Sequence, residues 1–244
     1  MSSLYLAESA ELAGLGPGDR FELTGDEARH AVTVARVRVG ERLAIGDGRG
    51  TIVRGAVAAT GPRELVVEVG EVVVEERPDR SLTLVQALAK GDRDELAVQA
   101  ATELGVDRIV PWAAARSVSR WDGPKAEKGR QRWASIVREA TKQSIRAWQP
   151  VVEPVTPTSG LAQRLQGTRV LVLEPSAPVA LTDLVFDGRD LALVVGPEGG
   201  IAPDELQRLG AAGAEAVRLG ASVLRTSTAG PAAIAVISAA IGRW

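Results

Sequence analysis

Two short apolar segments near the C-terminus, each followed by a glycine loop and a helical pattern, constrain this chain more than any other feature. The first segment, Leu191 to Val195, runs into the sequence GPEGG at residues 196–200, and a helical pattern opens at Pro203. The second, Ala216 to Leu219, meets Gly220 and a loop rich in Ser and Thr before an alanine-rich helix. Glycine permits positive φ and lets a ligand approach the backbone closely. Because ligands on parallel sheets bind beyond the carboxyl ends of strands, the two loops predict two walls of one pocket.

The pattern of the remaining segments predicts two domains. Residues 1–75 carry short alternating segments typical of strands, interrupted by one helical segment at residues 26–34, and strands this short favour a small β-barrel. Further along, strands alternate with helices, which predicts a mostly parallel α/β sheet covered on both faces. A charged connection at residues 71–80 marks the boundary. The predicted strands span residues 20–23, 42–45, 51–57, 64–69, 82–88, 108–112, 151–155, 170–173, 191–195 and 216–219. Two predicted helices span residues 92–104 and 124–145, and Asp92 is the expected N-cap of the first. Three further helices are predicted to begin at residues 158–159, at residue 203 and after the second glycine loop.

Composition excludes several classes of site. The chain of 244 residues has no cysteine and one histidine, His30, so a thiolate metal site is excluded and a zinc site or a histidine-based triad is disfavoured. The first residues lack the basic and apolar regions of a signal peptide, and no uncharged apolar window is long enough for a membrane span. We therefore expect a cytoplasmic protein without membrane attachment or metal.

Positive charge gathers in residues 107–146. This stretch holds ten Lys or Arg against four Asp or Glu, a net charge of +6 in a chain whose net charge is −2. Four of the five tryptophans, Trp112, Trp121, Trp133 and Trp148, lie in or beside it. Basic side chains interleaved with aromatic rings suit a nucleic acid, with phosphates to neutralise and bases to stack. A solvated helix face with core tryptophans is the alternative interpretation.

The residues of the first loop limit its ligand. A phosphate-binding P-loop needs GxxxxGK[ST], and the loop has neither the Lys nor the hydroxyl. A dinucleotide fingerprint needs GxGxxG after the first strand of its unit, which GPEGG does not match. Glu198 is unfavourable beside a pyrophosphate but suits a ligand with a cationic centre, such as S-adenosylmethionine. A purely structural turn is the alternative.

Several motifs resemble one family over nearly the whole chain. The sequences GPEGGIAPDE, LGASVLRTSTA and ALAKGDRDELAVQAATELGV, with Arg116-Ser117, are similar to the RsmE family of SPOUT-class methyltransferases. The sequence HAVTVARVRVGERLAIGDG, which begins at His30, resembles the family's PUA-like domain. The resemblance implies a PUA-like RNA-binding β-barrel at residues 1–75 and a trefoil-knotted SPOUT methyltransferase domain at residues 76–244. It also implies a homodimer that uses S-adenosylmethionine to methylate ring N3 of a uridine in 16S ribosomal RNA of the small subunit.

The resemblance implies cofactor-binding residues in three loops. Those of the first glycine loop are Gly196, Glu198, Gly199 and Gly200. Those of the second are Leu219, Gly220, Val223 and Leu224. Leu173 and Glu174 match the start of the third.

The chemistry of methyl transfer limits the catalytic roles. Displacement at a sulfonium methyl needs no metal, so alignment of the reacting atoms contributes most. The uridine imide nitrogen must lose its proton, and a cation near the carbonyl oxygens would stabilise the anion. Arg225 is the candidate for that cation, with a phosphate contact or a salt bridge to Glu198 as the alternatives. For the base, Glu198, Thr228 and bulk water remain open. Many family members read LRTETA where this chain reads LRTSTA, so Ser227 is assigned no catalytic role.

Six basic side chains are candidates for RNA contacts. They are His30, Arg36, Arg38, Lys90, Arg93 and Arg116. In the first domain, the alternative for His30 is a structural role, and the alternative for Arg36 and Arg38 is a solvated strand. In the second domain, Glu103 could instead hold one of the arginines in place.

Two other functions remain open. The chain could be an RNA-binding or assembly factor on a methyltransferase scaffold whose pocket is vestigial, which Ser227 favours slightly and the intact GPEGG and LRT motifs oppose. It could also be a ribose methyltransferase of the same knotted class.

Overall fold

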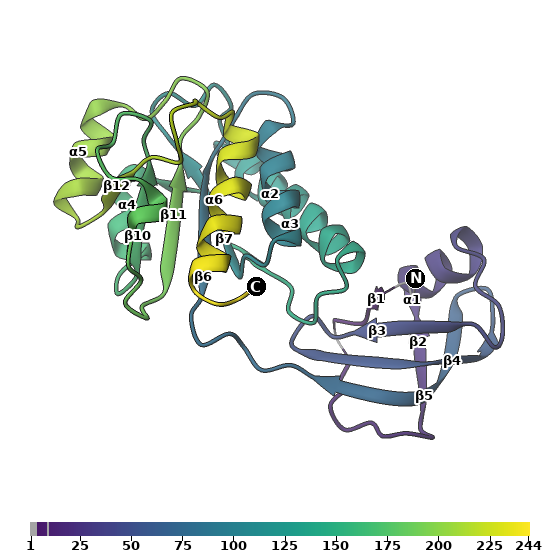
Figure 1. Ribbon diagram of the computed structural model, residues 1–244. Coiled ribbons are helices and arrows are strands. Elements are labelled where there is room, and N and C mark those ends of the chain that lie inside the picture. Colours follow the sequence, from purple (N-terminus) through teal and green to yellow (C-terminus); the bar gives the residue numbers. More distant parts are fainter. Residues whose placement is uncertain (1–3, 9) are drawn as a thin grey trace. The chain divides into compact units, whose positions relative to one another are not determined.

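A computed structural model describes residues 4–8 and 10–244, and these residues divide into two compact units (Figure 1). Unit 1 comprises the chain up to residue 77 together with residues 141–149. Unit 2 comprises residues 78–140 and 150–244. The return of residues 141–149 to unit 1 was not predicted from the sequence, because residues 141–143 are the last residues of the helix Pro124–Gln143, which was expected to belong to one domain.

Unit 1 is a curled five-stranded sheet in the order β1-β3-β4-β5-β2. Its strands are β1 (Leu4–Leu6), β2 (Arg20–Thr24), β3 (Arg42–Gly46), β4 (Thr51–Thr60) and β5 (Glu64–Val74). All neighbours pair antiparallel except β1, which lies parallel to β3. Alternate residues such as Val53, Val57, Leu65 and Val67 fill its core, as the predicted period of two requires.

The structure confirms one prediction in unit 1, a helical segment, and corrects another, the end of a strand. The helical segment expected at residues 26–34 is a short helix, α1 (Gly25–Arg29), that continues into a π-helical turn (His30–Val34). The predicted strand at residues 64–69 extends as β5 to Val74, so the charged connection begins only after it. Strand β1 was missed, because three apolar residues carry too little periodicity to predict a strand.

Residues 141–149 belong to unit 1 and make main-chain hydrogen bonds to residues 48–50. The Gly50 N–H donates to the Ala147 carbonyl at 3.0 Å, and the Gln149 N–H donates to the Gly48 carbonyl at 3.0 Å. Gly50 has φ of +109° and faces Trp148 so closely that a Cβ would lie 2.6 Å from the indole ring. Only glycine fits there.

Unit 2 is an all-parallel sheet in the order β12-β10-β11-β6-β7-β8, with β9 also paired to β7. Its strands are β6 (Leu82–Ala87), β7 (Arg108–Ala113), β8 (Val151–Val152), β9 (Thr156–Pro157), β10 (Arg169–Leu173), β11 (Leu191–Val195) and β12 (Glu215–Val217). Its helices are α2 (Arg93–Glu103), α3 (Pro124–Gln143), α4 (Thr158–Arg164), α5 (Pro203–Ala211) and α6 (Thr226–Ala240), with a 3₁₀ turn at Leu181–Asp183. The short β9 and the 3₁₀ turn were not predicted.

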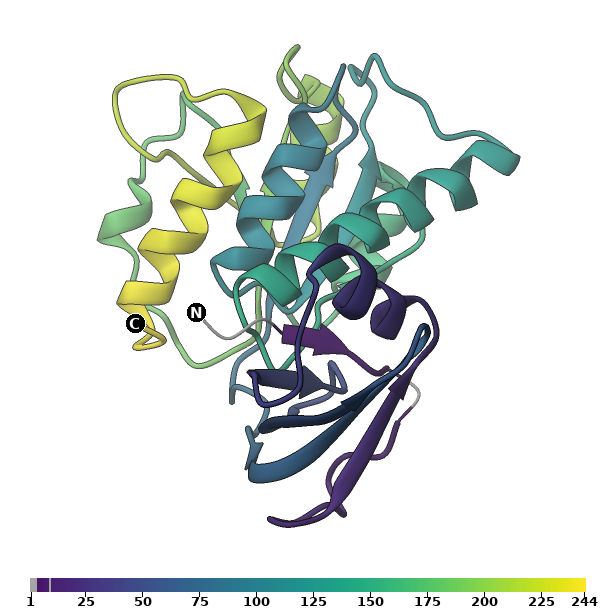
Figure 2. The ribbon, with the colours of Figure 1, turned by 90° about the vertical axis from the view of Figure 1, so that its right-hand side faces the viewer.

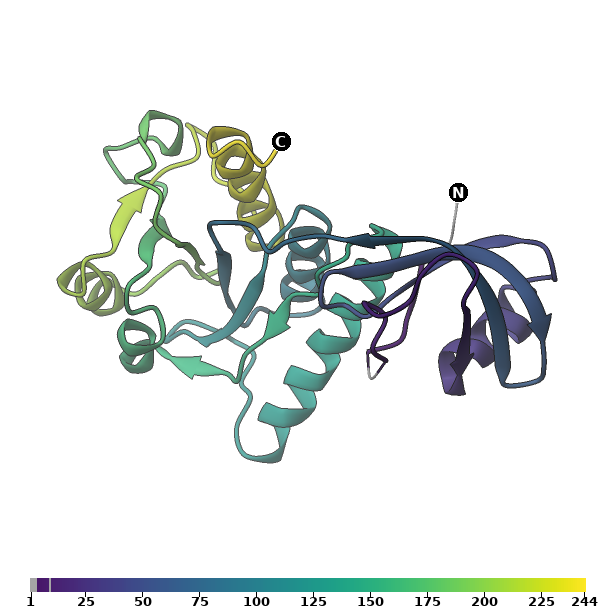
Figure 3. The same ribbon diagram turned by 90° about the horizontal axis from the view of Figure 1, so that it is seen from below.

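Helices cover both faces of this sheet, as predicted (Figures 2 and 3). On β11, Leu193 and Val195 face a core formed with α2, α3 and α6, whereas Ala192 and Val194 face a second core formed with α4 and α5. Every residue of β6 and β11 is buried, because both faces of these central strands are covered. The expected α/β sheet with a small β-barrel domain is confirmed.

The start of α2 differs from its prediction. Asp92 precedes the helix but makes no side-chain capping bond. The neighbouring carboxylate of Asp94 instead accepts hydrogen bonds from the backbone N–H groups of Ala89 and Glu95. Burial raises the pKa of Asp94, and these two backbone hydrogen bonds oppose that rise without cancelling it. Asp94 thus secures the loop between β6 and α2.

Candidate functional site

A cavity of about 370 Å³ opens at the carboxyl edge of the sheet in unit 2, where β10, β11 and β12 end side by side. Its volume lies within the range of small-molecule sites. The residues that line it are Arg93, Leu173, Glu174, Pro175, Val195, Gly196, Pro197, Glu198, Gly200, Ile201, Val217, Arg218, Leu219, Gly220, Ser222, Val223, Leu224, Arg225, Thr226 and Ala229. The two glycine loops therefore form two walls of one cavity, as their order in the sequence predicts.

Nine of the ten residues expected to bind a cofactor line this cavity. The exception is Gly199, whose carbonyl instead accepts a hydrogen bond from the Arg116 guanidinium at 3.0 Å. The third predicted segment, Leu173 and Glu174, closes the cavity from the end of β10. Sequence reasoning missed Pro175, Arg218 and Thr226, because only the fold brings them beside the glycine loops.

The first wall, residues 196–202, is held tightly. Gly200 has φ of +71°, and a Cβ on Gly196 would lie 2.7 Å from Ile201 Cγ1. The Glu198 carboxylate accepts hydrogen bonds from the Lys90 backbone N–H at 3.1 Å and from the Arg93 guanidinium at 3.0 Å. These bonds tie the loop to the segment that joins β6 to α2.

The charge state of Glu198 follows from those contacts. Partial burial by itself would raise its pKa. Hydrogen bonds from its own backbone N–H, from the Lys90 N–H and from the Arg93 guanidinium outweigh that effect, so the pKa of Glu198 lies below its ordinary value. An ionised carboxylate with a lowered pKa is a weak base at neutral pH. Its contacts suit a residue that holds the loop in place.

The far end of the first wall is fixed by a buried carboxylate, Glu205, in the first turn of α5. One of its oxygens accepts from the Ala115 backbone N–H and the Thr158 hydroxyl, and the other accepts from the Ala202 backbone N–H. Thr158 in turn accepts from the Trp112 indole N–H. This network satisfies the start of α5 although Ala202 has no side-chain acceptor of its own.

The second wall, residues 218–225, is held mainly at its ends. At its first end, the Arg218 N–H donates to the Val179 carbonyl, and the Arg218 carbonyl accepts from the Leu181 N–H. Within residues 4–8 and 10–244, no hydrogen bond involves residues 219–224. Val223 and Leu224 are 76% and 39% exposed although both are apolar. This wall thus exposes apolar side chains and is not held by hydrogen bonds along residues 219–224 of the described chain.

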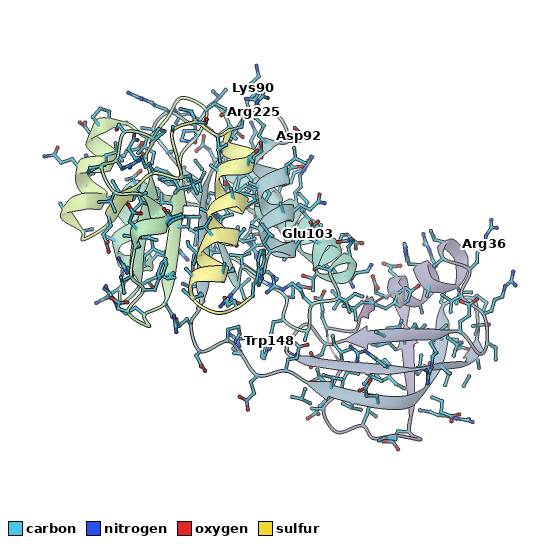
Figure 4. The ribbon with its side chains drawn as sticks, viewed as in Figure 1. Arg36, Lys90, Asp92, Glu103, Trp148 and Arg225 are labelled. Atoms are coloured by element: carbon cyan, nitrogen blue, oxygen red, sulfur yellow. The ribbon has the colours of Figure 1, made fainter. Side chains whose placement is uncertain are left out.

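Arg225 stands at the junction of the second wall and α6, as the residue that precedes the helix. It lines the cavity and is exposed to solvent. The alternative in which it forms a salt bridge with Glu198 is wrong in this structure, because that carboxylate binds Arg93. Figure 4 places Arg225 and Lys90 at the same end of unit 2.

Three of the six basic side chains expected to contact RNA gather near the cavity. All three bind the first wall: Arg93 and Arg116 through their guanidinium groups, and Lys90 through its backbone N–H. Glu103 holds none of these arginines; its carboxylate accepts from the Gln99 side chain, and Figure 4 shows it at the other end of α2.

The other three lie on unit 1, and all are exposed. His30 opens the π-helical turn, and Arg36 and Arg38 follow it. Arg36 has a backbone φ of +55°, a conformation that residues other than glycine seldom adopt. Such backbone outliers concentrate at functional sites, which makes this turn a candidate RNA contact.

The tryptophans of the basic stretch are mostly structural, which corrects the expectation that they stack on bases. Trp112 and Trp133 are fully buried. Trp121 packs edge-on against Trp133 with ring centroids 5.0 Å apart, and the Trp148 ring is covered by the Arg77 guanidinium at 4.4 Å. Core tryptophans, the alternative interpretation, describe this stretch better.

The described residues contain no group of three or more His, Asp or Glu side chains arranged to hold a metal ion. In the same part of the chain, none of the helices combines the length and the apolar character needed to cross a bilayer.

Comparison with known proteins matches both units. A family described as an RNA methyltransferase domain matches residues 75–238, and one described as an RNA methyltransferase PUA domain matches residues 23–70. Ribosomal RNA small subunit methyltransferase E of Mycobacterium tuberculosis is 46% identical over 90% of this chain and 86% of its own. The Bacillus subtilis protein of the same name is 33% identical over 89% of each. A crystal structure of the Neisseria gonorrhoeae protein of that name, bound to S-adenosyl methionine, has a TM-score of 0.87 at 28% identity and 98% coverage of both chains.

The fold and the site thus define an RNA methyltransferase of the SPOUT class with an N-terminal PUA domain, which confirms the expected fold class. Within that class, the chain belongs to the ribosomal RNA small subunit methyltransferase E family.

Proposed function

We propose that this chain transfers a methyl group from S-adenosylmethionine to ring N3 of a uridine in 16S ribosomal RNA. The observation that carries the proposal is the cavity between the two glycine loops, in a chain that aligns over 98% of its length with a relative solved with S-adenosyl methionine. The reaction and the uridine N3 position follow from the family to which the chain belongs.

The residues around the cavity fit this cofactor. Leu219, Val223 and Leu224 supply apolar surface for a flat purine, and the glycines of both loops leave backbone amides and carbonyls within reach of a ligand. Glu174 supplies negative charge for a ligand with a cationic sulfonium, and Glu198 lines the cavity while its carboxylate is paired with Arg93. We assign cofactor binding to these residues together with Leu173, Gly196, Gly200 and Gly220, whereas Gly199, which was expected to join them, holds the loop through its bond to Arg116. Bound there, S-adenosylmethionine supplies an activated methyl group.

Arg225 is proposed to be the catalytic residue. Deprotonation of the imide nitrogen spreads negative charge onto the two carbonyl oxygens of the uracil ring, and a guanidinium at the mouth of the cavity would stabilise that charge. Its geometry supports the role, because Arg225 lines the cavity and has no carboxylate partner among the described residues.

Glu198 is proposed to position the first wall rather than to act as a base, since its lowered pKa and its bonds to Lys90 and Arg93 both favour the ionised, engaged state. Thr228 lies in the first turn of α6 with an exposed side chain, and its backbone N–H donates to the Arg225 carbonyl. A neutral hydroxyl is a poor base. Proton loss to bulk water is therefore the route we favour.

The RNA partner is proposed to be 16S ribosomal RNA or the small ribosomal subunit. The PUA domain and the name of the relatives support an RNA substrate. We propose phosphate contacts for Lys90, Arg93 and Arg116 near the cavity, and further RNA contacts for His30, Arg36 and Arg38. In this proposal residues 1–75 serve RNA binding and residues 76–244 carry catalysis in a cytoplasmic homodimer. The exposed apolar Val223 and Leu224 beside the small-residue helix α6 are consistent with a further contact surface.

Mass spectrometry of nucleosides tests the proposal. Small ribosomal subunits or 16S RNA that lack the modification would be incubated with the protein and with S-adenosylmethionine carrying an isotopic methyl label. The expected product is labelled N3-methyluridine. A label on a ribose 2′-oxygen would identify a ribose methyltransferase, and RNA binding without any labelled nucleoside would identify an RNA-binding factor; either result contradicts the proposal.

A further inference from the structure

Thr226, the first residue of α6, joins the two walls of the cavity. Its hydroxyl donates to the Gly196 carbonyl, at 2.8 Å, and accepts from the Gln86 side-chain amide, at 2.9 Å. Gln86 lies near the end of β6 and is fully buried, and Thr226 is 6% exposed. Three segments that are far apart in sequence thus meet in one chain of hydrogen bonds, which links Gln86 through Thr226 to Gly196.

The direction of the chain is fixed by the number of protons available. The Thr226 hydroxyl has one proton, which it gives to the Gly196 carbonyl, so it can only accept from Gln86. The Gln86 amide therefore turns its nitrogen toward Thr226, and the same nitrogen also donates to the Ala87 carbonyl at 3.2 Å. Reversal of the amide would place two acceptors against each other and break the chain.

Among the residues that the structure describes, this arrangement leaves the buried Gln86 side-chain oxygen without a hydrogen-bond partner. A Cβ on Gly230 would lie 3.7 Å from that oxygen and 3.2 Å from Leu84 Cδ1, so α6 packs closely over the site. A buried acceptor without a partner costs stability, whereas an apolar side chain of similar shape would not. Stability alone therefore does not explain a glutamine here.

The geometry points to Gln86 and Thr226 as positioning residues for the cofactor. We propose that their hydrogen bonds fix the Gly196 carbonyl against the start of α6, and so set the separation of the two cavity walls before a ligand binds. Neither residue is among those assigned to cofactor or RNA contact above, although Thr226 also lines the cavity. The inference rests on the proposed function, because it concerns affinity for S-adenosylmethionine.

Three variants separate positioning from mere packing. Thr226→Val keeps the shape of the side chain and removes both hydrogen bonds, while Thr226→Ser keeps the hydroxyl and serves as its matched control. Gln86→Met keeps length and removes both the donor and the buried unpaired acceptor. Each would be measured by calorimetric titration with S-adenosylmethionine, by the split between KM and kcat, and by urea unfolding.

We expect Kd for S-adenosylmethionine to rise about tenfold in Thr226→Val and in Gln86→Met, with KM rising alongside, and to stay within about threefold of wild type in Thr226→Ser. Gln86→Met should unfold at a urea concentration no lower than wild type, because it removes the unpaired acceptor; it carries the test if Thr226→Val does not fold.

Three results would overturn the inference. Wild-type affinity in Gln86→Met, or in a folded Thr226→Val, would show that the hydrogen bonds do not set the cavity. Equal losses in Thr226→Ser and Thr226→Val would show that the hydroxyl is not what matters. No heat with the wild-type protein would instead remove the cofactor assignment itself, and the inference with it.

Discussion

The two walls of the cavity, one with three glycines and the other with one, are built in opposite ways. The first wall, residues 196–202, is bound by Arg93, Arg116 and Glu205, and by the backbone of Lys90. Across residues 219–224 of the second wall, no hydrogen bond is found within the described chain. Glycine richness therefore does not by itself say whether a loop is ordered; the side chains that surround it decide.

Because the two walls differ in how many hydrogen bonds hold them, we expect them to respond differently when a ligand binds. A loop that is already held loses little conformational entropy when a ligand arrives, whereas a loop held only at its ends must be ordered by the ligand. We infer that the first wall presents a preformed surface and that the second closes on the cofactor. The substrate-side cation, Arg225, lies at the end of the second wall, so its position depends on that closure.

The largest effect is expected from a methyl group added to the first wall. In Gly196→Ala the new Cβ would lie 2.7 Å from Ile201 Cγ1, so the fixed loop must shift. We expect a loss of about 1–3 kcal/mol in the free energy of unfolding by urea, together with weakened cofactor binding. Gly220→Ala, on the second wall, is the matched control. Apart from residues 219–221 themselves, no described atom lies within 4 Å of its new Cβ, so stability should change by less than about 0.5 kcal/mol. Equal losses in both variants would refute the contrast between the walls.

Loss of the cation at the end of the second wall should slow the chemical step. In Arg225→Ala we expect the single-turnover rate to fall by at least about tenfold with little change in affinity for S-adenosylmethionine, because the guanidinium acts on the uracil anion. Arg225→Lys serves as the control, because it keeps a positive charge at the same position and should retain more of the rate than Arg225→Ala. A wild-type rate in Arg225→Ala would remove this residue from the mechanism.

Removal of the cations near the first wall should weaken RNA binding. Lys90→Ala and Arg116→Ala are each expected to lower affinity severalfold and to reduce the slope of log K against log salt by about 0.7. Arg189→Ala is the control, because Arg189 precedes β11 at the opposite edge of the sheet and pairs with Asp187. Arg116→Ala should also loosen the first wall, since it loses the bond to Gly199. A salt slope equal to that of wild type would count against phosphate contact.

The smallest effect concerns the ionisation of Glu198. Its pKa is lowered in the folded protein, so its contribution to stability is fully present above its ordinary value of 4.5 and is lost as pH falls through the lowered value. Glu198→Gln should therefore be less stable than wild type by about 0.5 kcal/mol from pH 7 to about pH 5, and the gap should shrink below about pH 4.5.

The same variant tests whether Glu198 is the base. The pH dependence of kcat between about pH 6 and 9 should have the same shape in Glu198→Gln and wild type, because the carboxylate is ionised throughout that range. Disappearance of an ionisation near neutral pH in the variant would make Glu198 the base.

Sequence patterns predicted every strand of the parallel sheet except β9, and also the position of the cavity, because apolar segments such as Leu191–Val195 and the glycines after them carry local signals. The partners of those segments could not be predicted. That Glu198 binds Arg93 rather than Arg225, and that Thr226 reaches Gln86, depends on side-chain contacts across more than a hundred residues. Asp92 was a reasonable cap by composition, but the burial of Asp94 decided the local geometry.

The basic stretch at residues 107–146 also shows that side-chain contacts could not be predicted from the sequence. Its charge and its tryptophans predicted a stacking surface, yet Trp112 and Trp133 are core residues. Several of its arginines also have carboxylate partners, as Arg130 has in Glu127 and Arg132 in Glu95. Composition records which side chains are present but not which of them the fold buries or pairs.

Hydrogen exchange measured with and without S-adenosylmethionine tests the central claim most directly, because it locates the cofactor on the chain. We expect the amides of residues 219–225 to exchange rapidly in the free protein and to become protected when the cofactor binds. Those of residues 198–202 should exchange more slowly than the second wall at the outset and change less. Protection confined to other parts of the chain, or no protection at either wall, would contradict the assignment of this cavity to S-adenosylmethionine.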